Sequence, residues 1–169
     1  MKHVSDVAKY ALCSICFALP SFPQESQAND DLKQKVVGVW KLESFVTESV
    51  ETKEKRYTQG EKPNGYLIIT PERLMTVITG QGRKTAQTDE ERLALFRSLF
   101  AYTGPYKVEG DRLTTKVEVS WNESWVGSDQ TRIVRFEGDK LLLQTTPAPA
   151  ANQQMPGLIV ATLTWTKSK

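Results

Sequence analysis

Apolar and polar residues alternate along most of the chain after residue 36, in short runs that end at glycine, proline or charged residues. This period of two predicts β-strands, because successive side chains of a strand face opposite sides of a sheet. The predicted strands span 36–46, 66–70, 74–79, 102–108, 112–121, 130–137, 140–146 and 158–167, with a shorter one near 55–58. Tight turns connect several of them, as at 70–73, where Pro71 takes the second position. The pattern predicts an all-β fold: one antiparallel up-and-down β-barrel of about eight strands.

One segment departs from this period. Thr88 followed by Glu91 has the form of a capping box, in which each side chain accepts a hydrogen bond from the other residue's backbone amide. Leu93, Phe96 and Phe100 then recur at helical spacing and give one apolar face. We therefore expect a single α-helix, inserted between strands, that caps one end of the barrel. A bolder interpretation makes this helix a gate for a ligand.

The first 28 residues resemble a secretion leader. Lys2 and Lys9 flank a polar start, residues 10–19 are almost continuously apolar, and Ser26 and Ala28 are small residues of the kind that signal peptidase reads. The apolar run is too short to span a bilayer, so no stable membrane insertion is expected after processing. We predict a signal peptide over 1–28, cleavage after Ala28, and an exported barrel domain over 29–169. The alternatives are a disordered tail and an uncleaved anchor.

Composition narrows the chemistry further. The chain has 169 residues, enough for one domain, and 22 basic against 20 acidic residues give a net charge of only +2, so nucleic acid is not an expected partner. The only histidine, His3, and both cysteines, Cys13 and Cys16, lie in the leader. The mature domain therefore lacks the residues of Ser-His-Asp and Cys-His triads, the usual zinc ligands and an axial histidine for haem. No metal or cofactor is expected.

Short stretches spread over the whole mature chain resemble the lipocalin-like domain family of bacterial and fungal barrels. They are GVWKL at 38–42, PNGYLIITP at 63–71, AYTGPY at 101–106, the block 117–132 and LTW at 163–165. The resemblance implies that Trp40 plugs one end of the barrel and that the other end opens to a small-molecule cavity. Where family members commonly carry a histidine before the Val-Glu pair, this chain has Thr115 and Lys116.

Strand parity then predicts which side chains face the barrel interior. In the first strand, Trp40 and Leu42 share one face, and Phe45 falls on the other. In the strand 112–121, the inward set is Leu113, Thr115, Val117, Val119 and Trp121. Tyr102 and Tyr106 share a face with Val108.

Arg132 is the unusual member of these inward sets, because it shares parity with the apolar Val134 and Phe136. A buried guanidinium must be paired or hydrated, so two interpretations stay open. Arg132 either binds a carboxylate, enolate or phenolate of a ligand, or it pairs with an internal group and closes the barrel. The predicted ligand-binding residues are Arg132, Tyr66, Tyr102, Tyr106, Thr115 and Trp121, with Trp40 as the structural plug.

These observations favour an exported protein that holds a small hydrophobic or aromatic molecule, with or without an anionic group, in the barrel interior. One alternative is a histidine-free cyclase or isomerase that uses the same cavity, with Arg132 stabilising an anion and a tyrosine moving a proton. Another is a structural or interaction barrel with a filled core. The lack of histidine and of inward-facing carboxylate clusters favours binding over catalysis. Both a monomer and a dimer are compatible with the sequence.

Overall fold

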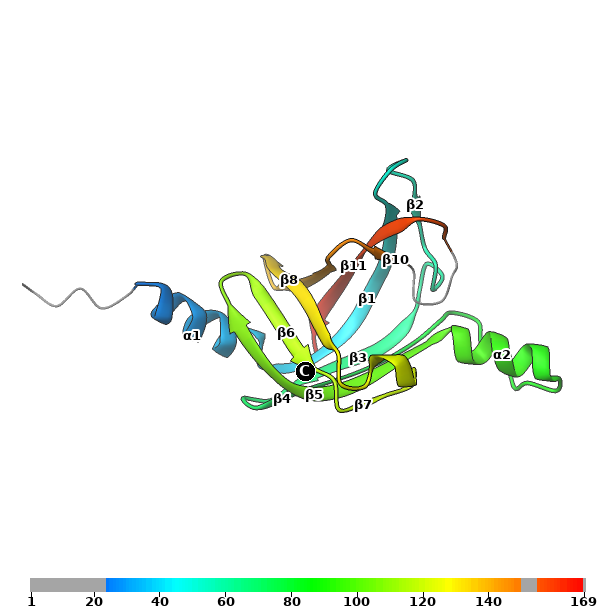
Figure 1. Cartoon of the computed structure of the whole chain (residues 1–169), viewed down its shortest axis with the longest axis horizontal. Coiled ribbons are helices and arrows are strands. Elements are labelled where there is room, and N and C mark those ends of the chain that lie inside the picture. The colour runs from blue at the N-terminus through cyan, green and yellow to red at the C-terminus, as the bar shows by residue number, and fades with distance from the viewer. Residues whose placement is uncertain (1–23, 150–154, 169) are drawn as a thin grey trace, which may run out of the picture.

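Eight antiparallel strands form a closed barrel in the computed structural model, which describes residues 24–149 and 155–168 (Figure 1). The ring consists of β1 (Gly38–Ser49), β3 (Asn64–Ile69), β4 (Arg73–Thr79), β5 (Leu99–Glu109), β6 (Arg112–Lys116), β8 (Asp129–Glu137), β9 (Lys140–Thr145) and β11 (Leu158–Lys167). Each strand pairs with the next one in this order, and β11 closes the ring on β1. The predicted up-and-down barrel is therefore confirmed.

Within the described residues, three short strands and three helical segments flank the ring. Strand β2 (Lys55–Arg56) pairs with β1, β7 (Val119–Ser120) pairs with β5, and β10 (Ala148–Pro149) pairs with β11. The helical segments are α1 (Gln24–Val36), α2 (Asp89–Arg97) and the 3-10 turn η1 (Glu123–Trp125). Figure 1 places α1 and α2 at opposite ends of the molecule.

Helix α1 closes one end of the barrel, and the sequence did not predict it. Val36, the last residue of the helix, has no exposed surface, and its carbonyl accepts a hydrogen bond from Trp40 Nε1 at 2.8 Å. The Lys35 ammonium lies 4.0 Å from the ring centroid of Phe136, which in turn packs against Trp40. The predicted cleavage point after Ala28 falls inside this helix, and residues 1–23 of the predicted leader lie outside the described residues.

A β-bulge in β1 changes which side chains face inward. The pairing of β1 with β11 shifts between Leu42 and Ser44, so one extra residue is inserted into β1 there. As a result Trp40, Leu42 and Phe45 are all at most 8% exposed, on the same side of the strand. The expectation that Phe45 would face away from Trp40 and Leu42 was wrong, because strand parity holds only while the pairing register is continuous.

A second irregularity separates β6 from β7. Thr115 pairs with Tyr106 of β5, but Val119 pairs with Thr103, so this segment carries one residue more than β5 does. The extra residue reverses the parity beyond Val117, which is 1% exposed. Val119 is consequently 64% exposed, and the prediction that it faces the interior was wrong.

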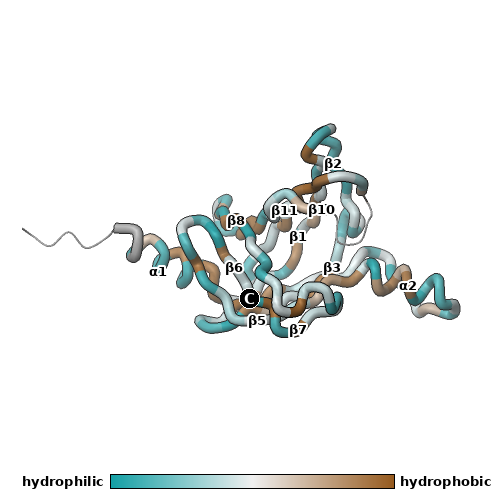
Figure 2. Tube along the Cα trace, viewed as in Figure 1, coloured by the Kyte–Doolittle hydropathy of each residue, from teal (hydrophilic) through white to brown (hydrophobic). Residues whose placement is uncertain are grey.

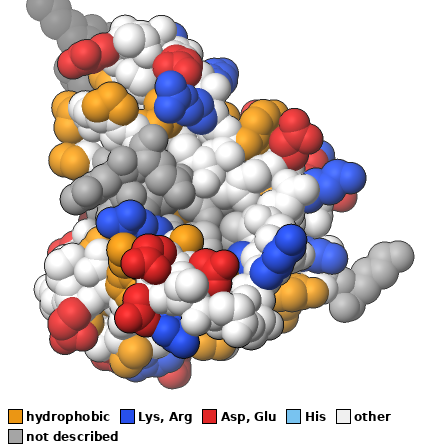
Figure 3. All heavy atoms as spheres, turned by 90° about the vertical axis from the view of Figure 1, so that its right-hand side faces the viewer, with side chains coloured by type: hydrophobic (Ala, Val, Ile, Leu, Met, Phe, Trp, Pro, Cys, Tyr) orange, Lys and Arg blue, Asp and Glu red, His pale blue; other side chains and the backbone are white. Residues whose placement is uncertain are grey.

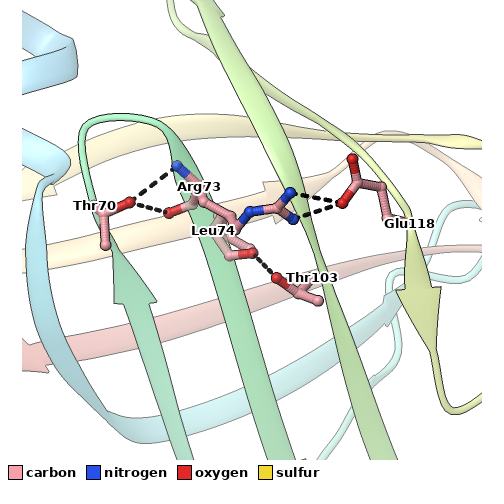
Figure 4. A network of polar contacts seen from close by, with 5 residues as sticks. All are labelled: Thr70, Arg73, Leu74, Thr103 and Glu118. Atoms are coloured by element: carbon pink, nitrogen blue, oxygen red, sulfur yellow. Dashed lines mark hydrogen bonds and ion pairs between the residues drawn. The ribbon is translucent and has the colours of Figure 1, made fainter.

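Polar contacts hold the segment between β6 and β7 against the outside of the barrel (Figure 4). Both terminal guanidinium nitrogens of Arg73, at the start of β4, donate to Glu118 Oε2 at 2.6 and 2.7 Å. The backbone amide of Glu118 donates to the Thr103 carbonyl at 2.9 Å, and the Thr103 hydroxyl donates to the Leu74 carbonyl at 2.8 Å. Because both charged side chains are about half exposed, the ion pair positions the segment more than it stabilises it.

Helix α2 confirms the predicted helix and its capping box. The Glu91 amide donates to Thr88 Oγ1, and the Thr88 amide donates to Glu91 Oε2, both at 3.2 Å. The helix does not lie across the barrel end, however. It projects away from the strands (Figures 1 and 2), none of its residues is buried, and Leu93 and Phe96 are 46% and 49% exposed.

The capping box should make α2 sensitive to acid. Hydrogen bonds from the amides of Gln87 and Thr88 hold the pKa of Glu91 below its ordinary value. A carboxyl group whose pKa is lowered by folding stabilises the fold above its ordinary pKa and loses that effect as the pH falls through the folded pKa. We expect the helical Cα chemical shifts of 89–97 to diminish below about pH 4. Glu91→Ala should weaken these shifts at neutral pH and flatten the pH profile; an unchanged profile would contradict the prediction.

Candidate functional site

The barrel encloses a cavity of about 300 Å³ at the end away from α1. Its inner wall is largely apolar, with side chains from β1, β3, β4, β5, β9 and β11, among them Phe45, Leu67, Ile78, Phe100, Leu143 and Leu163. Thr58, just after β2, and Pro149, in β10, also line the cavity. Figure 3 views the molecule from the side of α2, and acidic and basic side chains are interspersed over that face.

Several polar groups of the cavity wall are already bonded within the protein. The hydroxyls of Thr47 and Thr58 lie 2.9 Å apart and form a hydrogen bond. Thr145 Oγ1 accepts from the Ala161 amide at 2.9 Å, and Thr76 Oγ1 donates to a carbonyl of β3. The hydroxyls of these threonines are therefore already satisfied within the wall.

Two charged residues of β8 line the cavity, namely Asp129 at the start of the strand and Arg132 on its inner face. The Arg132 guanidinium is the positively charged group of the pair. It is partly buried, and its Nη1 donates to the Thr131 carbonyl at 2.8 Å and more weakly to Gln130 Oε1 at 3.5 Å. The guanidinium carbon lies 6.0 Å from the ring centroid of Tyr102. No carboxylate among the described residues lies within 4.0 Å of it, and the nearby Asp129 instead pairs with Lys116 at 3.5 Å.

Aromatic side chains form the wall of the cavity near Arg132. Phe45 and Phe100 stack with ring centroids 5.7 Å apart, and Tyr102 meets Trp125 edge-on at 5.7 Å. Trp121 lies against both Phe100 and Trp125, at 4.9 and 4.8 Å. This wall offers flat apolar surface and ring edges, which suit a planar aromatic ligand.

Two of the residues predicted to bind a ligand meet at the cavity, namely Arg132 and Tyr102. Trp121 does not face the interior, because the extra residue before β7 turns it outward, where it packs against the aromatic wall from behind. Tyr66 lies on the outer face of β3, 48% exposed, since its neighbours Leu67 and Gly65 occupy the inner face. Tyr66 therefore lies outside the cavity, contrary to the prediction.

The other two predicted residues are buried elsewhere in the barrel and do not line this cavity. Thr115 has no exposed surface. Tyr106 is 9% exposed, and its hydroxyl donates to the Thr70 carbonyl at 2.9 Å. Burial raises the pKa of Tyr106, so its phenol stays protonated and keeps this bond. Both residues support the fold beside the cavity and make no contact with its open space.

Sequence reasoning missed four aromatic residues that line the cavity: Phe45, Phe100, Trp125 and Trp165. The bulge in β1 hides the first from parity analysis, and helical spacing assigned the second to α2 although it belongs to β5. Trp125 lies on η1, a turn that Asn122 caps by accepting from the Ser124 amide. The only signal for Trp125 in the sequence was the Trp-Val-Gly stretch inside the block 117–132, which resembles the lipocalin-like domain family.

A closed up-and-down barrel with an internal cavity of this kind defines the protein as a lipocalin-like barrel. The chain belongs to the family of the lipocalin-like domain, whose family model matches residues 37–168. No curated protein matches the chain. Among solved structures, it is similar to the crystal structure of a point mutant of the fluorescent protein UnaG, with 15% identity, a TM-score of 0.38, and coverage of 80% of this chain and 98% of that one.

Membrane-spanning and metal-binding features are both lacking within the part of the chain that the structure describes. None of the helices there has the length and apolar character needed to cross a membrane. No group of three or more histidine, cysteine, aspartate or glutamate side chains within 24–149 and 155–168 is placed to hold a metal ion.

Proposed function

We propose that this chain binds a small apolar or aromatic molecule in the barrel interior, with an anionic group of the ligand at Arg132. The observation that carries the proposal is a partly buried guanidinium that reaches a mainly apolar cavity and has no carboxylate partner among the described residues. Burying such a charge without a counter-charge is costly, and a carboxylate or sulfonate can accept two parallel hydrogen bonds from it.

The size of the cavity supports a ligand of one or two rings. A volume of about 300 Å³ lies at the lower end of the range of small-molecule sites, and largely apolar lining with a few polar groups is typical of them. The same volume disfavours the alternative of a barrel with a filled core. The cyclase or isomerase alternative would have to rely on Tyr102, the tyrosine that lines the cavity.

Export belongs to the same proposal. It is supported by the leader-like segment 1–28, with its lysines, its apolar run and its small residues before position 29. An exported barrel of this family would then capture or carry its ligand outside the cytoplasm.

Arg132→Gln provides the test, with Arg135→Gln as the matched control. Arg135 lies on the same strand but points outward and is exposed. We expect Arg132→Gln to weaken binding of the anionic dye 1-anilinonaphthalene-8-sulfonate about tenfold, since a hydrogen bond to a charged group contributes roughly 1.5–3 kcal/mol. Binding of the uncharged analogue N-phenyl-1-naphthylamine should hardly change, and Arg135→Gln should affect neither dye. Fluorescence titration measures all of these affinities.

Two results would overturn the proposal. If neither dye binds the wild-type protein, or if Arg132→Gln changes no dye affinity relative to Arg135→Gln, the cavity does not use this arginine for an anion. Thermal unfolding of both variants checks that the barrel is intact.

A further inference from the structure

The indole N–H of Trp165 has no hydrogen-bond partner among the described residues. Trp165 belongs to β11, lines the cavity and is 1% exposed. Its Nε1 atom is buried, yet no acceptor lies within reach. The neighbouring Trp40 shows the usual alternative, because its Nε1 donates to the Val36 carbonyl at 2.8 Å. Buried donors in proteins are nearly always paired, so this one calls for an explanation.

The side chains that lie across the sheet from Trp165 offer no acceptor. Its partners across the sheet are Leu42 on β1 and Leu141 on β9, both apolar. Both leucines are at most 5% exposed, so this part of the barrel wall is buried and apolar. An unpaired donor in such a place is costly, and an acceptor that enters from the cavity would relieve the cost.

Trp165 and Arg132 mark two different levels of the barrel. Both residues lie next to β9: Arg132 of β8 pairs with Thr145, and Trp165 of β11 pairs with Leu141. These positions are four residues apart, or roughly 13 Å along the strand. Arg132 lies toward the end where Thr145 and Pro149 line the cavity, and Trp165 lies toward α1, beside the level of Trp40.

We propose that the ligand is an elongated aromatic acid with a second acceptor, a carbonyl or ether oxygen, at the end remote from its anionic group. The anionic group pairs with Arg132, and the remote oxygen accepts a hydrogen bond from Trp165 Nε1. This inference rests on the proposed function and adds the class of the ligand and its direction in the cavity. Because Nε1 is covered in this structure, binding includes a local adjustment of the side chains around the indole.

A pair of rod-shaped acids tests the inference. 4′-Acetylbiphenyl-4-carboxylate carries a carbonyl oxygen opposite its carboxylate, and 4′-isopropenylbiphenyl-4-carboxylate has a CH₂ group in place of that oxygen. By isothermal titration calorimetry, the wild-type protein should bind the acetyl compound about fivefold more tightly or better, the usual effect of one hydrogen bond. In a ¹⁵N–¹H spectrum, the acetyl compound alone should move the indole N–H resonance of Trp165 downfield.

Trp165→Phe keeps an aromatic ring and removes the N–H. It should abolish the preference for the acetyl compound, whereas Trp40→Phe, the matched control with an already bonded indole, should leave the preference unchanged. Arg132→Gln should weaken both compounds by the same factor. The wild-type ligand comparison and the indole resonance stand even if Trp165→Phe fails to fold.

The outcomes separate the two proposals. Equal affinities of the two rods for the wild-type protein, or an indole resonance of Trp165 that moves with neither, would overturn the role of Trp165 and leave the proposed function intact. The same holds if the two naphthyl dyes bind but neither rod does. If neither naphthyl dye binds, the proposed function fails, and this inference fails with it.

Discussion

Replacing Trp40 with alanine is expected to destabilise the protein by about 3–5 kcal/mol, the usual cost of deleting a large aromatic side chain from a packed core. Trp40 is 2% exposed and packs against Phe136, with ring centroids 6.2 Å apart. Its Nε1 also ties β1 to the end of α1 through the Val36 carbonyl. The variant therefore loses the buried ring and the contact that closes this end of the barrel. Chemical denaturation followed by circular dichroism measures the effect.

Two controls separate the contributions of Trp40. Trp40→Phe removes the N–H but keeps most of the buried ring. The free energy of unfolding should therefore fall by about 1 kcal/mol for the lost hydrogen bond, and by a further amount for the smaller ring. Tyr66→Ala removes an aromatic side chain that is 48% exposed on the outer face, and it should cost much less than Trp40→Ala. If Trp40→Ala were as mild as Tyr66→Ala, Trp40 would not be a structural plug.

Gly104→Ala is expected to cost about 3 kcal/mol or more, and it can prevent folding altogether. A Cβ atom at Gly104 would overlap the carbonyl oxygen of Lys116 and lie 2.8 Å from its carbonyl carbon. Both are backbone atoms, so no side-chain rotation relieves the clash. The strand would have to move at the point where the extra residue between β6 and β7 lets the chain approach β5 closely.

Gly138→Ala is the matched control for Gly104→Ala. Gly138 has a φ of +61° and open space around it, so alanine there meets backbone strain alone, about 1–2 kcal/mol. Thermal and urea unfolding should rank the two variants clearly. Amide exchange at Glu118 and Val119 should also accelerate in Gly104→Ala but not in Gly138→Ala. Equal stability of the two variants would show that the close approach at Lys116 is absent in solution.

The barrel itself could be predicted because its signals are local. Alternation of apolar and polar residues depends only on the two faces of a strand, and tight turns such as the one from Thr70 to Arg73 keep successive strands adjacent. The capping box of α2 is likewise a matter of neighbouring residues, Thr88 and Glu91. Helix α1 has no such signal: it is strongly polar, and its place is set by the docking of Val36 against Trp40.

The cavity was predicted less well, because strand parity fails where the register shifts. Strand parity placed Arg132 and Tyr102 correctly on the inner face, since β8 and β5 pair regularly around them. It misplaced Phe45 and Trp121, since each follows an inserted residue that no local pattern marks. One added residue turns every later side chain of a strand to the opposite face.

The order of the strands, their turns, the capped helix and the absence of histidine and cysteine beyond residue 16 could all be read from the amino-acid sequence. The folded barrel was needed to show which side chains line the cavity, that α2 projects from the barrel, and that the indole of Trp165 lacks an acceptor among the described residues. Strand and turn propensities act between neighbours in the chain. Register shifts and hydrogen-bond partners depend instead on contacts between residues far apart in sequence, which exist only once the barrel has closed.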